Sequence, residues 1–210
     1  MHEEDGQEDP GAQARDCGHV LGPRAAHALL CKAGPARMRP HRHLAAVLCR
    51  ELRAIGAEVD MERVVPELID RRPQTPAEKR DAVLDLVVSF PGAFAQSWID
   101  VSIRCPHAER YGRADHVPGE AAAKAAEDKH ERYGPFVLPL AFESYGRLGS
   151  AGRRTLEILA AHAGACAKDH WAVQRLVPRW SSALERAVTF STAEVVLLSL
   201  GGRVGDTFGK

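Results

Sequence analysis

Two aspartates stand in apolar segments whose alternation is typical of β-strands, and they are the residues in this chain best suited to chemistry. Asp85 lies within residues 81–89 and Asp100 within residues 97–103. If residues 90–96 close a hairpin, residues whose numbers sum to about 185 lie opposite each other, which brings Asp85 close to Asp100. Two carboxylates at that distance repel each other unless a cation joins them, so the pair predicts a divalent metal site.

A third carboxylate, Glu51, lies on or beside the core-facing stripe of a helix predicted over residues 41–55. An acidic side chain is costly there unless something compensates it, and a nearby metal would do so. Taken alone, Asp85 is better explained as a strand-end residue bonded to solvent or to Arg80 than as a metal ligand. The three carboxylates together, however, favour a metal site. Asp81 is the alternative to Asp85, because it lies on the same face of the strand.

Composition and charge limit the class of protein but do not indicate a binding partner. The 210 residues are 45% hydrophobic, which suffices for one globular domain with short accessory segments. The 28 basic residues balance 28 acidic ones, so net charge gives no argument about a polyanionic partner. The five cysteines are scattered, the N-terminus is acidic and no apolar run approaches the roughly 20 residues of a membrane span. We expect an intracellular protein without a membrane segment.

Hydrophobic periodicity and breakers predict a mixed α/β (α+β) chain in the order αβββαβα, followed by a long helix that Pro178 opens. The hairpin makes the sheet at least partly antiparallel. We divide the chain into a disordered segment (1–16), a Gly- and Pro-punctuated segment (17–40), a core (41–146) and a C-terminal helical extension (147–210). The predicted elements are a helix at 41–55, strands at 58–65, 81–89 and 97–103, a helix at 119–133, a strand at 136–142 and a helix at 151–163.

The order αβββαβ over residues 41–145, with Glu51 on the helix and an aspartate on each of two strands, resembles the PD-(D/E)xK restriction-like nuclease fold. That fold has a mixed central sheet flanked by helices. Leu84-Asp85-Leu86 is similar to its first aspartate motif and Ile99-Asp100-Val101 to its second. The lysine that usually follows two residues later is Ser102 here.

In the restriction-like endonuclease domain of site-specific non-LTR retrotransposons, that lysine is displaced into the following helix, within a Lys-x-x-(Lys/Arg)-Tyr pattern. Lys129-His130-Glu131-Arg132-Tyr133 matches this pattern. The resemblance therefore implies Lys129 as the catalytic lysine, with Lys124 as the alternative. It also implies Mg²⁺ or Mn²⁺ held by Asp85, Asp100 and Glu51, in an enzyme that nicks DNA.

A second resemblance lies upstream, to the zinc-knuckle and linker segment that precedes this nuclease domain in reverse-transcriptase polyproteins. Cys17, His27 and Cys31 fit the pattern, while its first cysteine would fall at Ala14 and is absent. Structural zinc takes four ligands, so a Zn²⁺ ion here would have to borrow a neighbouring histidine or water. A decayed remnant without metal is the alternative.

Contacts with nucleic acid are expected from four residues. Arg39 and Arg42 belong to a basic cluster at residues 37–43 that can meet phosphates, although a plain exposed linker explains the cluster equally well. Arg132 follows Lys129 on its helix, and Tyr133 can stack on a base, with core packing as the other explanation.

The resemblance implies DNA as the partner and a nuclear location, with element RNA and a reverse transcriptase acting in trans as further candidates. Two other functions fit the same residues. One is a catalytically inactive nucleic-acid-binding remnant. The other, suggested by the fold alone, is a repair or resolvase-type nuclease.

Overall fold

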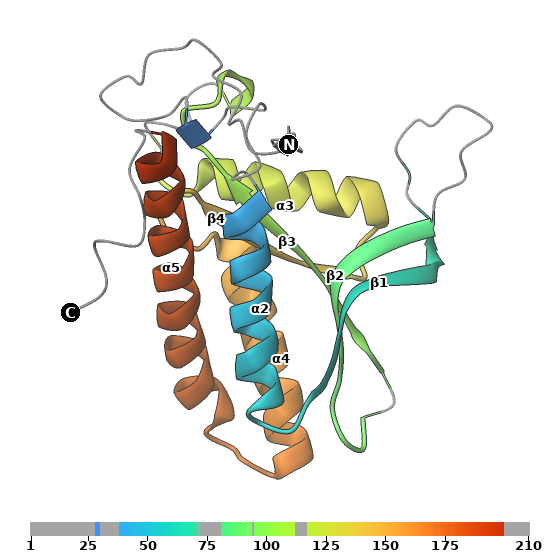
Figure 1. Ribbon diagram of the computed structural model, residues 1–210. Coiled ribbons are helices and arrows are strands. Elements are labelled where there is room, and N and C mark those ends of the chain that lie inside the picture. Colours follow the sequence, from blue (N-terminus) through green and yellow to red (C-terminus); the bar gives the residue numbers. More distant parts are fainter. Residues whose placement is uncertain are drawn as a thin grey trace, which may run out of the picture.

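The computed structural model describes residues 28–29, 38–69, 71, 81–93, 95–111 and 117–199. Within these ranges the chain forms one four-stranded sheet flanked by helices, which confirms the mixed α/β class and the predicted order of elements (Figure 1). The elements are α2 (Arg39–Arg53), β1 (Glu58–Ile69), β2 (Asp81–Ser89), β3 (Ser97–Arg104), the short 3₁₀ helix η2 (Glu109–Tyr111), α3 (Glu120–Tyr133), β4 (Val137–Glu143), α4 (Ser150–Ala167) and α5 (Ala172–Ser199).

The sheet is mixed, with its strands in the order β1-β2-β3-β4. The first three strands are antiparallel neighbours, whereas β3 and β4 run parallel. The β2–β3 hairpin has the predicted register, since Leu86 lies opposite Ile99 and Val88 opposite Ser97. The chain reaches β4 through α3, a helical crossover of the kind that parallel strands need.

The larger core lies between one face of the sheet and helices α2, α4 and α5 (Figure 1). Leu44, Leu48 and Leu52 recur with helical spacing, so α2 presents one fully buried stripe to this core, as predicted. Trp180 of α5 is also fully buried in it. The core is therefore continuous across residue 146, and the C-terminal helices belong to it. Among the described helices, none is long and apolar enough to cross a membrane.

Helix α3 covers the opposite face of the sheet. Leu140 and Phe142 of β4 point into the larger core, whereas Ala141 between them packs on three alanines of α3. These small side chains let the helix approach the strand closely. The buried carboxylate of Glu143 accepts a hydrogen bond at 2.9 Å from the N–H of Gly119, which precedes the helix. The end of β4 thus binds the first turn of α3, where helical N–H groups lack partners.

The sheet opens beside Asp85. The pairing of β2 with β3 ends one residue pair before Asp85 and Asp100 would meet. On the other side, Glu62 of β1 interrupts the β1–β2 pairing opposite Asp85 and has a φ of 51°. A left-handed conformation costs a non-glycine residue roughly 1–2 kcal/mol. Leu84 and Leu86, on either side of Asp85, belong to two different apolar clusters, although simple alternation would place them together.

Three predicted boundaries were wrong, and one is the end of α4, which lies at Ala167 and not at residue 163. Strand β1 continues to Ile69, past the expected end at residue 65, because Ile69 still pairs with Asp81. The helix expected to begin at Pro178 begins at Ala172 instead, with Pro178 inside it. Proline removes one main-chain hydrogen bond from a helix interior. Burial of Leu176 and its neighbours against the core offsets that loss, so packing overrides the local signal.

Replacing Trp180 with alanine should lower the free energy of unfolding by about 3–5 kcal/mol, because the ring is lost from a closely packed core. Urea unfolding followed by circular dichroism measures the change. The matched control is Trp171→Ala, since Trp171 is 71% exposed. That variant should stay within about 0.5 kcal/mol of the wild type. Equal losses in the two variants would contradict the position of α5 in the core.

Candidate active site

Asp85 and Asp100 come together where β2 parts from β3. The Oδ2 atom of Asp85 accepts a hydrogen bond at 2.6 Å from the main-chain N–H of Val101. A side chain thus replaces the strand pairing that ends at this point. The two carboxyl groups are close enough for each to change the pKa of the other. The proximity that the hairpin register predicts is present.

Lys129 reaches Asp100 from helix α3. Its Nζ atom donates a hydrogen bond at 2.8 Å to Oδ1 and lies 2.5 Å from Oδ2 without hydrogen-bonding geometry. The side chains of Lys129 and Asp100 are only 13% and 6% exposed, so the ion pair is largely shielded from water. Lys124, the alternative, pairs with Glu120 at 2.8 Å and donates to the carbonyl oxygen of Tyr111. Lys129 is therefore the lysine at the carboxylates.

The two aspartates have opposite pKa shifts. Burial raises the pKa of Asp100 from 3.8 to about 6, Lys129 opposes the rise, and the charge of Asp85 adds to it. Burial also acts to raise the pKa of Asp85, but hydrogen bonds from His41 and Val101 outweigh it and hold the pKa below its usual value. Asp85 is consequently the more firmly ionised of the two.

His41 is the residue of α2 that contacts the pair, and the sequence did not predict it there. Its Nε2 atom lies 3.3 Å from Oδ2 of Asp85. The hydrogen bond to Asp85 raises the pKa of His41, which favours the imidazolium form. The sequence places His41 in a basic cluster, and Pro40 marks the first turn of α2. Neither signal says which strand that turn meets.

Glu51 is not brought to the carboxylate pair. It lies about 15 Å along the helix axis from His41, at 1.5 Å per residue. Its carboxylate instead forms an ion pair at 3.0 Å with Arg179 of α5. An arginine therefore compensates this half-buried charge, which the sequence had assigned to a metal. Asp81 is also absent from the pair, since it is exposed at the outer end of β2.

The four residues predicted to contact nucleic acid lie on two helices. Arg39 pairs with Glu194 of α5 at 2.8 Å, and Arg42 is exposed beside it on α2. The guanidinium of Arg132 lies 4.5 Å from the ring of Tyr133. Tyr133 itself is buried in an apolar cluster, which favours the packing explanation of that tyrosine over base stacking.

The donor atoms present fit a magnesium-type ion. Within the described ranges, no group of three or more His, Cys, Asp or Glu side chains could hold a metal. Mg²⁺ nevertheless binds through one or two carboxylates and completes its coordination with water and substrate phosphate. Oδ2 of Asp100 is a buried oxygen that forms an ion pair with Lys129 and receives no hydrogen bond from the described atoms, and Asp85 adds a second carboxylate beside it. Cys17, His27 and Cys31 lie outside the described residues.

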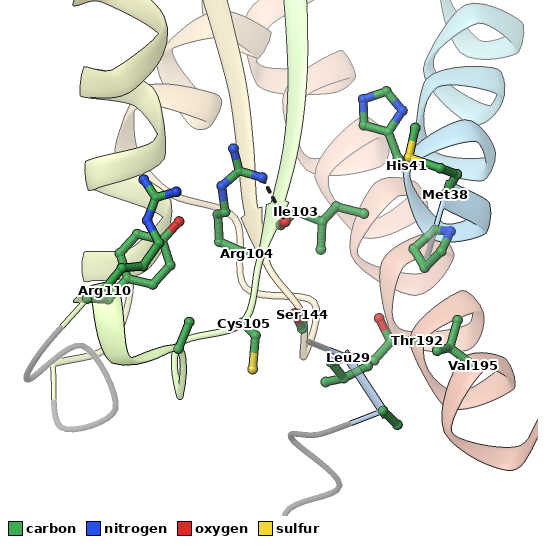
Figure 2. Close-up of a pocket in the computed structure, with 14 residues that line it drawn as sticks. Leu29, Met38, His41, Ile103, Arg104, Cys105, Arg110, Ser144, Thr192 and Val195 are labelled. Atoms are coloured by element: carbon green, nitrogen blue, oxygen red, sulfur yellow. Dashed lines mark hydrogen bonds between the residues drawn. The ribbon is translucent and has the colours of Figure 1, made fainter. Parts of the chain in front are cut away.

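Two cavities are lined by residues that contact the carboxylate pair, His41 in one and Lys129 in the other. One, of about 310 Å³, lies between the start of α2 and the end of β3, where His41 stands on one side of the strand and Arg104 and Arg110 on the other (Figure 2). The second, of about 410 Å³, lies along α3 and is lined by Lys129, Arg132 and again Arg104. Neither cavity is lined by the two aspartates. The two cavities share Arg104 and Arg110.

No family model, curated protein or solved structure matches this chain. What the protein does must therefore be inferred from the geometry of the site. The informative features are the paired aspartates, the buried lysine on the following helix and the opening in the sheet between them.

The free energy of unfolding should depend on pH through Asp100. Folding raises the pKa of Asp100 from 3.8 to about 6, so the folded chain binds more protons than the unfolded chain in that window. Through Asp100, stability therefore falls as the pH rises from about 4 to about 6. The variant Lys129→Met removes the cation that opposes this pKa rise, which extends the fall above pH 6.

Urea unfolding in EDTA should show Lys129→Met losing about 1–3 kcal/mol more than the wild type between about pH 6 and pH 8. The matched control is Lys124→Met, which removes only a partly exposed ion pair with Glu120. Its pH profile should run parallel to that of the wild type. Three parallel profiles would contradict the placement of Lys129 against Asp100.

Proposed function

We propose that the protein is a metal-dependent DNA endonuclease of the PD-(D/E)xK class, derived from the nicking domain of a non-LTR retrotransposon. The observation that carries the proposal is the ion pair between Lys129 and Asp100, formed beside Asp85. Strand β3 has Ser102 where a lysine of this class usually stands. The lysine instead comes from the next helix, which is the displacement that the Lys-x-x-(Lys/Arg)-Tyr pattern implies.

The architecture supports the same class. The elements from α2 to β4 follow the order αβββαβ, and the sheet has three antiparallel strands with a fourth parallel to the third. The two aspartates stand on the central strands β2 and β3, at the place where these strands separate. Helices α2 and α3 bring His41 and Lys129 to the carboxylates from opposite faces of the sheet.

Asp85 and Asp100 would hold one or two Mg²⁺ or Mn²⁺ ions. When bound, such an ion lowers the pKa of a water molecule and offsets the negative charge of the phosphate. The chain contributes the rest of the site. Val101 and His41 hold the Asp85 carboxylate ionised and fixed, and Lys129 holds Asp100 while offering a cation to the charge that develops on the scissile phosphate.

The proposed reaction is hydrolysis of one phosphodiester bond in DNA. The water oxygen bonds to phosphorus as the bond from phosphorus to the 3′ oxygen breaks, and that oxygen takes a proton. The products are a 3′-hydroxyl and a 5′-phosphate. In the resembled elements a 3′-hydroxyl primes reverse transcription, a step for which a reverse transcriptase in trans and element RNA would be the partners.

Nicking of supercoiled plasmid with Mg²⁺ or Mn²⁺ tests the proposal. The wild type should convert supercoiled to open-circular DNA, and EDTA should abolish the reaction. Asp100→Ala should lower the rate at least about 100-fold, since it removes a metal ligand. Lys129→Ala should lower it by about 100-fold as well, because one positioned donor to the reacting phosphate is lost.

Glu51→Gln is the matched carboxylate control, because Glu51 pairs with Arg179 and not with the aspartates. It should retain the nicking rate of the wild type. A folded wild type that binds DNA with strong salt dependence but never nicks would overturn the enzyme and support the inactive binding remnant. Nicking that survives Asp100→Ala would place the reaction elsewhere or in a contaminant.

A further inference from the structure

The cavity along α3 carries more positive than negative charge. Five basic side chains and two acidic ones line its volume of about 410 Å³. Asp128 is balanced by Arg110 at 2.5 Å, and Lys129 is engaged with Asp100. Glu131 is the other acidic side chain. Arg71, Arg104 and Arg132 also line the cavity, and the guanidinium of Arg132 lies 4.5 Å from the ring of Tyr133.

Arg104 is the least satisfied of these side chains. It is half-buried at the end of β3 and interacts with the side chain of Tyr111. Its Nη1 atom makes a long contact of 3.4 Å to the carbonyl oxygen of Ile103, and its buried Nε atom has no hydrogen-bond partner among the described atoms. None of the ion pairs between described residues includes Arg104. A half-buried guanidinium without an anion is costly, so this position favours an anionic ligand.

The unsatisfied atoms form a row that leads away from the carboxylate pair. Asp100, Ser102 and Arg104 lie on one face of β3, and each has a buried polar atom without a hydrogen-bond partner in the described part of the chain. The row spans about 13 Å from Asp100 to Arg104, at roughly 3.3 Å per residue. On α3, Lys129 and Arg132 are neighbours on one helical face and line the same cavity.

We propose that Arg104 and Arg132 form a subsite for a backbone phosphate of the DNA strand, next to the phosphate that is cut at Asp85 and Asp100. The identity of the ligand rests on the proposed function. Guanidinium groups present N–H forks that match phosphate oxygens in pairs, which an ammonium cannot do. A phosphate bound at Arg104 and Arg132 would fix the direction in which the DNA strand crosses the aspartates. Such a contact carries no sequence information.

Fluorescence anisotropy with a short labelled DNA duplex in EDTA tests the subsite without requiring cleavage. Arg104→Gln should weaken binding about tenfold, because hydrogen bonds to a charged group are lost. It should also reduce the slope of log affinity against log salt by about 0.9, the value for one phosphate contact. Arg132→Gln should do the same. Arg186→Gln on α5 is the control, an exposed arginine whose described contact is with Ser182 on its own helix.

Thermal unfolding shows whether each variant folds, and if Arg104→Gln does not, Arg132→Gln decides. Folded variants that bind with the affinity and salt slope of the wild type would overturn the subsite, as would a wild type that does not bind DNA. A wild type that nicks while both variants bind normally would leave the nuclease standing without the subsite. A wild type that never nicks while both variants bind weakly would leave the subsite standing without the nuclease.

Discussion

The hydrogen bond from Val101 to Asp85 is the constraint on which the site depends. Where β2 leaves β3, the main-chain N–H of Val101 loses its strand partner, and a buried N–H must find another. The Asp85 carboxylate fills that role at 2.6 Å. The Asp85 carboxylate thereby lies beside Asp100 in a largely buried position. The positive charge that this arrangement needs comes from His41 of α2 and Lys129 of α3, helices that cover opposite faces of the sheet.

The position of Lys129 depends in turn on how α3 is fastened to β4. The buried Glu143 carboxylate binds the N–H of Gly119, a residue whose φ of 89° suits glycine and turns the chain into the helix. Ala141 meets three alanines of α3, and larger side chains there would push the helix away from the sheet. The end of β4, which does not contact the aspartates, thus fixes the position along the sheet at which Lys129 meets Asp100.

The sequence predicts the local parts of this site better than the distant ones. The register of the β2–β3 hairpin follows from alternation and turn length, so the proximity of Asp85 and Asp100 is accessible to sequence reasoning. Sequence reasoning cannot decide whether Glu51 or His41 of α2 reaches the aspartate pair. A helical stripe shows which face of α2 is buried, but both residues border that face, and only the packing of α5 decides. Arg179 of α5 takes Glu51, while the other end of α2 meets the opening in the sheet.

The unsatisfied groups along β3 bear on what the site binds. Oδ2 of Asp100 forms an ion pair with Lys129, whereas Nε of Arg104 and the hydroxyl of Ser102 have no hydrogen-bond partner in the described part of the chain. Each such buried group costs about 1–3 kcal/mol if nothing satisfies it. Lys129 already offsets part of the charge of Asp100, so Arg104 is the end of the row that lacks a counter-ion among the described residues. Under the proposed function, a divalent metal at the aspartates and a phosphate at Arg104 would occupy the two ends of the row.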